Sequence, residues 1–423
     1  MNASERALKP QTQTILCYLL LFLHFSLYLS HCLSYTYEKH ISTSLNDLTL
    51  GKYSHTLNSR IQNLKCSLYD SSAVCLLKIT TRVNNLSDNF AEDLTFLKQI
   101  GMDGVSFSRG PMFARATQIL QPSHPYEVDE LIHNLNAAVK MTRQAGLEAN
   151  EARFDITNAL LGKPEGEKEL ETAMALIKAA GDATVSHMWV GPLGIRLGPG
   201  GVPGRYNRAH RGGYLMSAFS VKLMKAELNK RDLSSRWAHH FTNHVTSEDY
   251  VKNLVKALQQ LVPIAEDADV RLMLHTDDPP VPDTDNLLPG IVSPLMINRV
   301  FEAVPSENLG LLFCVGTRYE SGVNVYDQIR LFGKMGKIFS VHFRNVRGTI
   351  PSAGEYEEVM LDEGDMDMFS ILKALKATGY DGALNIDHSA IFVGDEKQRA
   401  TIAWNVGYIR ALLQALQSEG YDG

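Results

Sequence analysis

The sequence predicts a TIM (β/α)8 barrel over residues 74–423, with an insertion after the fourth strand and an unrelated extension over residues 1–73. Eight apolar segments of strand length recur from Val74 onward, and segments with apolar residues at three- and four-residue spacing lie between them. Several of the helical segments end on the glycine that commonly follows a helix. Eight equivalent units favour a closed barrel over a doubly wound open sheet, which rarely carries so many.

The strand and helix segments alternate along the chain in a regular order. The predicted strands cover residues 74–79, 104–108, 147–154, 183–190, 270–274, 309–313, 338–341 and 383–386. The predicted helices cover residues 90–101, 129–146, 169–181, 249–266, 294–304, 326–336 and 367–379. In the last of these, Asp365 or Asp367 is expected to cap the helix N-terminus.

The insertion lies between Trp189 and Val245 and is rich in glycine and arginine. It leaves the C-terminal end of the fourth strand, which is the end where barrel enzymes bind their substrates. Two interpretations stay open, a solvated surface loop and a lid over the active site. Its arginines, among them Arg211, would suit an acidic ligand.

The N-terminal extension differs from the rest of the chain. An apolar run at Ile15–Leu29 follows a head that carries Arg6 and Lys9, which is the layout of a signal peptide or a signal anchor. A third interpretation is that this region has no fixed structure, because Glu38–Ser72 is polar and lacks periodicity. The cellular location therefore stays open, and membrane contact is expected only through this segment if the mature protein retains it.

The composition excludes several classes of protein. Lys and Arg total 41 against 47 Asp and Glu, a net charge of -6, so no broad basic field is available for a nucleic-acid partner. Five cysteines are too few for a disulfide-built scaffold, and only Cys314 lies beyond residue 75. A disulfide between Cys66 and Cys75 would require export, whereas a free thiol at Cys314 favours a reducing compartment.

Residues able to bind a metal follow each of the last four predicted strands. They are His275, Cys314, His342 and Asp387, and about one strand-helix unit separates each from the next. Each alone is more simply explained as a buried or capping residue. In a closed barrel, however, the four positions converge on one rim, so together they predict a metal site.

The predicted ligand set combines two imidazoles, a thiolate and a carboxylate. This mixture suits Zn(II), Mn(II), Fe(II) or Co(II) and suits Mg or Ca poorly. Four protein ligands leave coordination positions open for substrate oxygens on a metal that accepts five or six. The pattern therefore favours a catalytic site over a closed structural one.

Polar residues near these positions fit an acidic substrate. Asp277 and Asp278 follow His275 in the loop after the fifth strand, although turn chemistry alone would explain them. Strand alternation places Arg344 on the same face as His342, where its guanidinium could hold a carboxylate. Arg347 lies just beyond, and a surface position is the simpler expectation for it.

His388 stands next to the predicted ligand Asp387, so it would sit at the metal centre without necessarily binding the ion. A histidine in such a place is a natural general acid or base.

At these motifs the sequence resembles the mannonate dehydratase family of the xylose-isomerase-like barrel group. The matching strings are HTDDPP from His275, Cys314 followed by Gly-Thr, HFRNVRG from His342, EGDMDMFSILKAL from Glu363, and the pair Asp387-His388. RGGYLMSAF from Arg211 is a weaker match in the insertion. The resemblance runs from about Val74 to the C-terminus.

The resemblance implies both a site and a reaction. It implies that His275, Cys314, His342 and Asp387 bind Mn(II) or Fe(II), with His388 as the catalytic acid or base. The implied reaction dehydrates D-mannonate to 2-dehydro-3-deoxy-D-gluconate in hexuronate (glucuronate) catabolism. It requires a base for the C2 proton and a second proton donor for the C3 hydroxyl. A homo-oligomer stays open as the assembly.

Three residues depart from the family pattern. Ser389 and Ala390 stand where the family usually has Gly-His, and Arg399 stands near the position of a tyrosine that takes part in proton transfer. An arginine cannot act as that acid or base near neutral pH. Two alternatives follow, another xylose-isomerase-like sugar isomerase or epimerase, and a barrel that binds a sugar acid without turning it over. The thiolate of Cys314 counts against the first.

Overall fold

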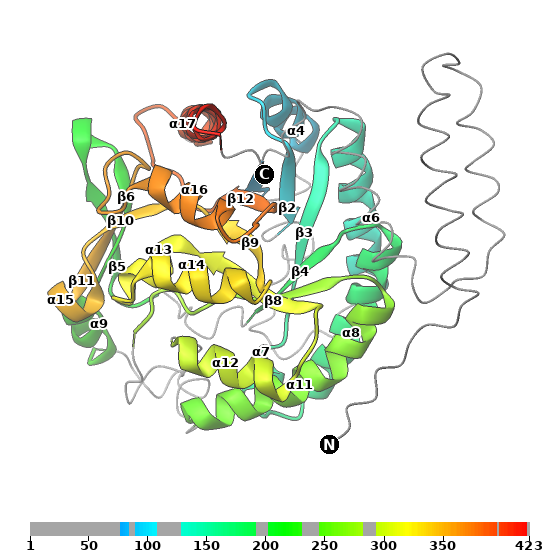
Figure 1. The fold of residues 1–423 in the computed structure, drawn as a ribbon. Coiled ribbons are helices and arrows are strands. Elements are labelled where there is room, and N and C mark those ends of the chain that lie inside the picture. Colours follow the sequence, from blue (N-terminus) through cyan, green and yellow to red (C-terminus); the bar gives the residue numbers. More distant parts are fainter. Residues whose placement is uncertain are drawn as a thin grey trace, which may run out of the picture. The chain divides into compact units, whose positions relative to one another are not determined.

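The computed structural model describes residues 77–83, 89–107, 128–191, 202–230, 245–281, 293–395 and 397–420. Eight parallel strands close into a barrel in the order β1-β12-β9-β8-β7-β4-β3-β2, which confirms the predicted fold class (Figure 1). The extension over residues 1–73, with its apolar segment, lies outside the described residues, as do the first four cysteines. Among the described helices, none combines the length and the apolar character needed to cross a bilayer.

The barrel strands follow the predicted order closely. They are β1 (Lys78–Arg82), β2 (Gly104–Phe107), β3 (Glu148–Asp155), β4 (His187–Gly191), β7 (Arg271–Leu274), β8 (Leu309–Cys314), β9 (Ile338–His342) and β12 (Ala383–Ile386).

Two strands were predicted with wrong boundaries. The first runs from Lys78 to Arg82 and not over residues 74–79, because Thr80 and Thr81 are buried in the barrel although they are polar. The fourth begins at His187 and not at Ala183, because Ala183 caps the preceding helix. The first correction places Arg82 at the C-terminal end of β1.

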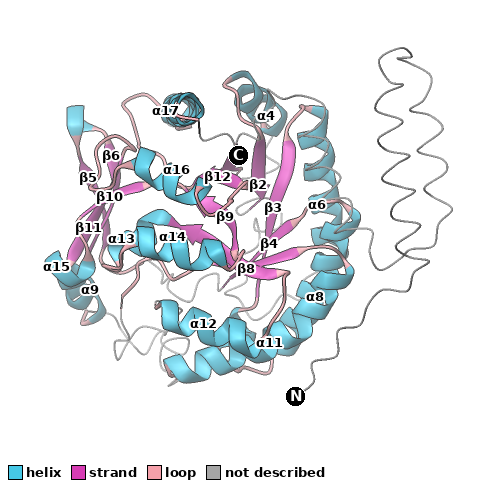
Figure 2. Ribbon diagram, in the orientation of Figure 1, coloured by secondary structure: helices cyan, strands magenta, loops and turns pink. Residues whose placement is uncertain are grey.

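Helices surround the barrel, as Figure 2 shows. The seven predicted helices are confirmed as α4 (Phe90–Gln99), α6 (Val128–Gln144), α8 (Gly166–Asp182), α11 (Ser247–Asp267), α12 (Pro294–Ala303), α14 (Val325–Lys334) and α16 (Met368–Lys376). Asp367 caps α16, because its side chain accepts a hydrogen bond from the backbone N–H of Phe369 at 3.0 Å. The prediction omitted α17 (Arg399–Ser418) and the short helices α7 (Thr157–Leu160) and α13 (Val315–Glu320).

A second, antiparallel sheet lies beside the barrel and was not predicted. Its strand order is β10-β11-β6-β5. The insertion supplies β5 (Arg205–Ala209) and β6 (Leu215–Ser220), joined by the 3-10 turn η1 (Arg211–Gly213) and followed by α9 (Val221–Leu228). The segment between β9 and α16 supplies β10 (Asn345–Arg347) and β11 (Glu355–Val359), with α15 (Ile350–Ala353) between them. Strands β5 and β6 of the insertion are therefore held in a sheet by β11, through pairs such as Tyr356–Phe219.

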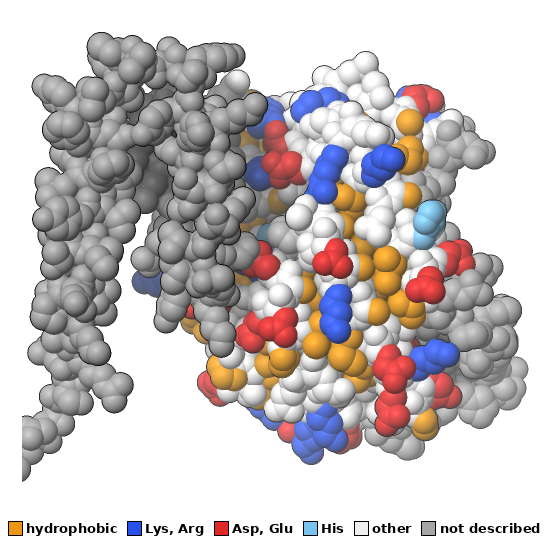
Figure 3. Space-filling view, turned by 90° about the vertical axis from the view of Figure 1, so that its right-hand side faces the viewer, with side chains coloured by type: hydrophobic (Ala, Val, Ile, Leu, Met, Phe, Trp, Pro, Cys, Tyr) orange, Lys and Arg blue, Asp and Glu red, His pale blue; other side chains and the backbone are white. Residues whose placement is uncertain are grey.

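Buried apolar side chains fill the barrel beneath the rim. Met273, Leu312 and Phe339 form a cluster there with Trp189 packed against it. On the face seen in Figure 3, basic and acidic side chains are interspersed over the described part of the surface. Charge of one sign therefore does not gather on that face.

Two adjacent residues of α14 test this description of the core. Phe332 is 0% exposed and its ring lies edge-on to Phe301, whereas Leu331 is 40% exposed. Phe332→Ala is expected to lower the free energy of unfolding by about 3–5 kcal/mol through the cavity it creates. Leu331→Ala, the matched control, should change it by about 0.5 kcal/mol. Urea unfolding followed by circular dichroism measures both, and equal losses would contradict the assigned helix face.

Candidate active site

Four side chains from different strands meet at the C-terminal rim of the barrel. His275 follows β7, Cys314 ends β8, His342 ends β9 and Asp387 follows β12. His275, Cys314 and His342 each offer a ligand atom within 4.8 Å of the other two. The Oδ2 atom of Asp387 lies 3.4 Å from Nδ1 of His342. The structure thus brings together all four residues that the sequence suggested as metal ligands.

The surroundings of these side chains suit a metal. Burial lowers the pKa of His275 to about 4 and holds the pKa of His342 well below its ordinary value, so both imidazoles are neutral, as metal ligands must be. Nδ1 of His275 faces the carbonyl oxygen of Thr276, which leaves Nε2 for the ion. Nε2 of His275 lies 3.1 Å from Nδ1 of His342, and this contact identifies the two candidate ligand atoms.

The thiol of Cys314 is buried at the start of α13. The backbone N–H and the hydroxyl of Thr317 lie 3.4 Å and 3.0 Å from its Sγ and donate to it. Burial raises the pKa of the thiol, while the nearby guanidinium of Arg344 acts in the opposite direction. A divalent ion would displace the proton, because thiolate is the form that binds metal.

Trp189 forms a wall beside the two histidines. Its ring lies 5.1 Å from that of His275 and 6.0 Å from that of His342, and the guanidinium of Arg153 stacks on it at 3.7 Å. Neither residue of this wall was predicted from the sequence; Trp189 lies in the middle of β4 and Arg153 near the end of β3. The aromatic ring therefore borders both imidazoles.

Arg344 is buried among carboxylates of the protein. Its Nη1 atom donates to Glu320 at 2.5 Å and its Nη2 atom to Asp278 at 2.7 Å. Oxygens of Glu358 and Asp387 lie 3.5 Å and 3.6 Å from the guanidinium. The side chain points into the rim, as strand alternation indicated, but these carboxylates surround it. Arg344 is therefore a positioning residue for Asp278 and Asp387.

A glycine lets this guanidinium approach the start of α13. A Cβ atom on Gly316 would lie 2.7 Å from the Cζ atom of Arg344, which is closer than real Cβ contacts allow. The Gly-Thr pair after Cys314 therefore has a physical reason. Gly316 makes room for Arg344, and Thr317 donates to the thiol sulfur.

Asp278 joins the barrel to the second sheet. Besides Arg344, it binds the guanidinium of Arg205 on β5 and accepts a hydrogen bond from the hydroxyl of Tyr356 at 3.1 Å. The two arginines hold the pKa of Asp278 well below its usual range against the effect of burial. Asp277 precedes it in the same loop and is half-buried.

His388 is oriented by a carboxylate from the second sheet. Its Nδ1 atom lies 2.7 Å from Oε2 of Glu358, a buried residue of β11. Its Nε2 atom lies 3.5 Å from Oδ2 of Asp387. The pKa of Glu358 is held below its ordinary value by His388 and the two arginines, although burial opposes this. An ionised carboxylate only accepts hydrogen bonds, so Nδ1 carries the proton and Nε2 is the basic nitrogen.

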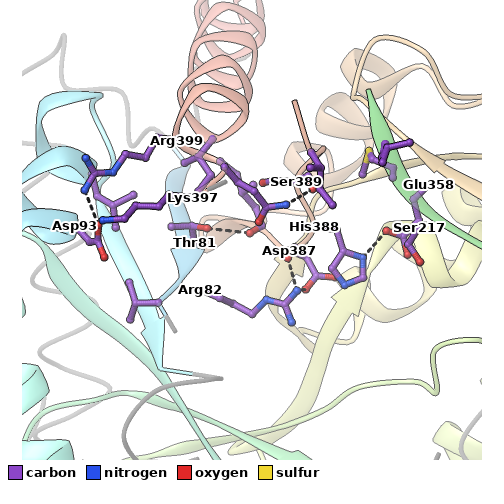
Figure 4. A pocket seen from close by; sticks show the side chains of 18 of the residues that line it. Thr81, Arg82, Asp93, Ser217, Glu358, Asp387, His388, Ser389, Lys397 and Arg399 are labelled. Carbon is purple, nitrogen blue, oxygen red and sulfur yellow. Dashed lines mark hydrogen bonds and ion pairs between the residues drawn. The ribbon is translucent and has the colours of Figure 1, made fainter. Parts of the chain in front are cut away.

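A cavity of about 530 Å³ opens beside these residues (Figure 4). The barrel contributes Thr81, Arg82, Asp387 and His388 to its lining. The insertion contributes Arg205, Asn207, Leu215, Met216 and Ser217, and the approach to α17 contributes Lys397, Gln398 and Arg399. The insertion therefore forms one wall of the cavity, as expected of a segment that covers an active site.

The other arginines suggested from the sequence lie elsewhere. Arg347 donates from Nε to the carbonyl oxygen of Glu363 at 2.7 Å, and exposed Arg211 pairs with Asp362 at 2.7 Å. Neither lines the cavity. Arg82 does line the cavity, and it was not predicted as a site residue because the predicted first strand ended at residue 79.

The residues that depart from the family pattern also have places in the structure. Ala390 is buried in an apolar cluster with Tyr214 and Met216, and the carbonyl oxygen of Ser389 accepts from Gln398 at 2.7 Å. Arg399 lies in the cavity wall, where two carboxylates of α4 hold its guanidinium. Its Nη2 atom lies 2.7 Å from both Glu92 and Asp93.

Comparison with known proteins confirms the resemblance over the C-terminal part of the barrel. Residues 215–420 match the family model of D-mannonate dehydratase (UxuA). The mannonate dehydratase of Thermotoga petrophila is 35% identical over 159 residues, which cover 36% of this chain and 42% of the relative. Mannonate dehydratase 2 of Halalkalibacterium halodurans is 29% identical over 154 residues, covering 36% and 44%. These matches thus span less than half the length of the curated relatives.

The fold is similar to solved structures over a larger part of the chain. The crystal structure of mannonate dehydratase from Streptococcus suis serotype 2 aligns with a TM-score of 0.64 and 22% identity, covering 82% of this chain and 95% of that one. A xylose isomerase domain protein from Planctomyces limnophilus aligns with a TM-score of 0.51 and 14% identity, covering 81% and 99%. These similarities support the barrel fold.

Loss of the thiol tests the metal site directly. Cys314→Ser is expected to weaken Co(II) binding by more than about 100-fold. Loss of a residue that only hydrogen-bonds to a metal ligand already lowers metal affinity by about 10–100-fold, and loss of a ligand should cost more. The thiolate charge-transfer absorption of the Co(II) protein should also disappear. Titration with Co(II) in the absorption spectrometer measures both effects. His133→Gln, which removes an exposed imidazole on α6, is the control. A charge-transfer band that persists in Cys314→Ser would contradict ligation by this residue.

Proposed function

We propose that this protein is a metal-dependent mannonate dehydratase, which converts D-mannonate to 2-dehydro-3-deoxy-D-gluconate and water in hexuronate catabolism. The observation that carries the proposal is the convergence of His275, Cys314, His342 and Asp387 beside His388. All five lie in the part of the chain that matches the dehydratase family model. Mn(II) or Fe(II) is the proposed ion, because both accept this mixed ligand set and still leave positions for substrate oxygens.

The chain's own residues account for removal of the C2 proton. That proton is barely acidic beside an ionised carboxylate, and a bound divalent ion supplies the positive charge that stabilises the developing anion. His388 presents its basic Nε2 atom next to Asp387, while Glu358 keeps the proton on Nδ1. Nε2 takes the C2 proton, and the electron pair of the C2–H bond forms the C2–C3 double bond.

The C3–O bond breaks as this double bond forms, and the hydroxyl leaves as water with a proton drawn from solvent, while His388 returns the C2 proton to solvent. The enol product then rearranges to the 2-keto-3-deoxy acid. Arg399 is not the proton donor, because an arginine does not release its proton near neutral pH and because Glu92 and Asp93 hold its guanidinium. In this position its charge is compensated by these two carboxylates.

The decisive test is turnover by the full chain. Protein loaded anaerobically with Mn(II), and separately with Fe(II), should form the 2-keto-3-deoxy acid from D-mannonate and lose this activity on chelation. His388→Ala is expected to lower kcat by about 100- to 10,000-fold, the usual contribution of a general base. His133→Gln serves as the control. If folded, metal-loaded protein formed no product, the proposal would be wrong for D-mannonate, and binding without turnover would become the better description.

Two adjacent glutamates of β11 test the orientation of His388. Glu358 is buried against His388, whereas Glu357 pairs with Arg208 at 2.8 Å on the other face of the strand. Glu358→Gln should lower kcat by roughly 10- to 100-fold with little change in KM, because the imidazole loses its orienting charge and not its contact with substrate. Glu357→Gln should leave both constants unchanged. Steady-state assays with D-mannonate distinguish the two, and a pure KM effect at Glu358 would contradict the assigned role.

A further inference from the structure

We propose that Arg82, at the C-terminal end of β1, binds the carboxylate of the substrate and thereby selects acids over neutral sugars. This inference deepens the proposed function, since it assigns the residue that recognises the acid group. It also replaces Arg344, Arg347 and Arg211, which the sequence suggested for this task.

Three arginines and one lysine line the cavity. Arg205 is bound to Asp278 and lies 3.5 Å from Glu358, and Arg399 is bound to the two carboxylates of α4. Each of these two arginines thus faces two carboxylates of the protein, whereas Arg82 is paired with one, that of Asp387. Arg82 and Lys397 remain as the other cationic side chains of the lining. Lys397 is exposed and its ammonium is a solvated point charge, so it is less suited to fix a planar carboxylate.

Arg82 has the donors that a second anion needs. Its Nη2 atom lies 2.5 Å from Oδ1 of Asp387 and also donates to the backbone carbonyl of that residue. Among the described residues, Asp387 is the partner that the structure records for this guanidinium. A guanidinium has five N–H donors in a planar fork, so one edge can hold Asp387 while other donors face the cavity. Figure 4 shows Arg82 and Asp387 side by side in the cavity wall.

The position of Arg82 also fits the chemistry. Arg82 contacts Oδ1 of Asp387, while His388 Nε2 and His342 Nδ1 lie 3.5 Å and 3.4 Å from its Oδ2. Arg82 and His388 therefore flank the same carboxylate. An acid held by Arg82 brings its α-carbon beside Nε2, which is the placement that removal of the C2 proton requires.

The side chain is also partly desolvated. Its exposed fraction is 11%, and that of Asp387 is 4%. A charged hydrogen bond made there is stronger than one at an open surface, because the surrounding dielectric is lower. A neutral amide or alcohol in the same place would not make this charged hydrogen bond with Arg82. The difference in binding free energy between the acid and the neutral compound is what selects the acid.

Binding of an unreactive acid and its neutral isostere tests the proposal without turnover. Full-length protein loaded with Mn(II) is titrated calorimetrically with D-gluconate and with D-gluconamide. Arg82→Gln is expected to weaken gluconate binding by roughly 10- to 100-fold, the worth of a hydrogen bond to a charged group, and to leave gluconamide binding unchanged. Arg82→Lys, which keeps the charge beside Asp387 but loses the fork, should show a smaller loss.

Arg410→Gln is the matched control, because Arg410 also pairs with a carboxylate, Asp103 at 2.7 Å, but does not line the cavity. Mn(II) affinity and Tm are measured for every variant. Unchanged gluconate binding in Arg82→Gln would overturn the proposal. Equal losses for gluconate, gluconamide and Mn(II) would also overturn it, because Arg82 would then only position Asp387. If Arg82 governs gluconate binding while D-mannonate is not dehydrated, the proposed function fails and this inference stands.

Discussion

The buried guanidinium of Arg344 is the constraint on which the site depends. A charge removed from water costs several kcal/mol unless it is paired and hydrogen-bonded, so the protein must bring carboxylates to it. They come from four places: Glu320 on α13, Asp278 after β7, Glu358 on β11 and Asp387 after β12. This requirement joins barrel loops to the second sheet. It therefore explains why Glu358, which orients His388, lies at the rim at all.

The same network sets the charge of the cavity. Four carboxyl groups, those of Glu320, Asp278, Glu358 and Asp387, surround Arg344, and Arg205 and Arg82 pair with two of them. Burial raises the pKa of Glu320, whereas the arginines hold the pKa of Asp278 below its usual range against the same effect. The rim therefore holds anionic and cationic groups that compensate one another, and a divalent ion bound there would add positive charge that an acidic ligand could balance.

The site residues at the ends of apolar strands could be predicted from the sequence. Those on a strand with polar residues, or on a strand that pairs with the insertion, could not. His275, Cys314 and His342 follow runs of buried side chains, so their convergence could be expected from the barrel alone. Arg82 was not predicted as a site residue, because polar Thr80 and Thr81 precede it and hide the end of its strand. Glu358 was not predicted as a site residue, because its strand pairs with the insertion, more than a hundred residues away in the sequence. No local sequence pattern encodes such pairing. Arg344 was placed correctly, but its carboxylate partners are a tertiary feature.

The second sheet gives the insertion a role beyond that of a simple cover. β6 of the insertion pairs with β11, and β5 pairs with β6, so Arg205 and Ser217 in the cavity wall are tied to the strand that carries Glu358. A movement of this wall away from the barrel would strain or break the contacts from Arg205 to Asp278 and Glu358. Access to the cavity and orientation of His388 therefore depend on the same backbone pairing. If this wall moved as a lid, its closure would be coupled to the orientation of His388, because Glu358 lies on the strand that pairs with the insertion.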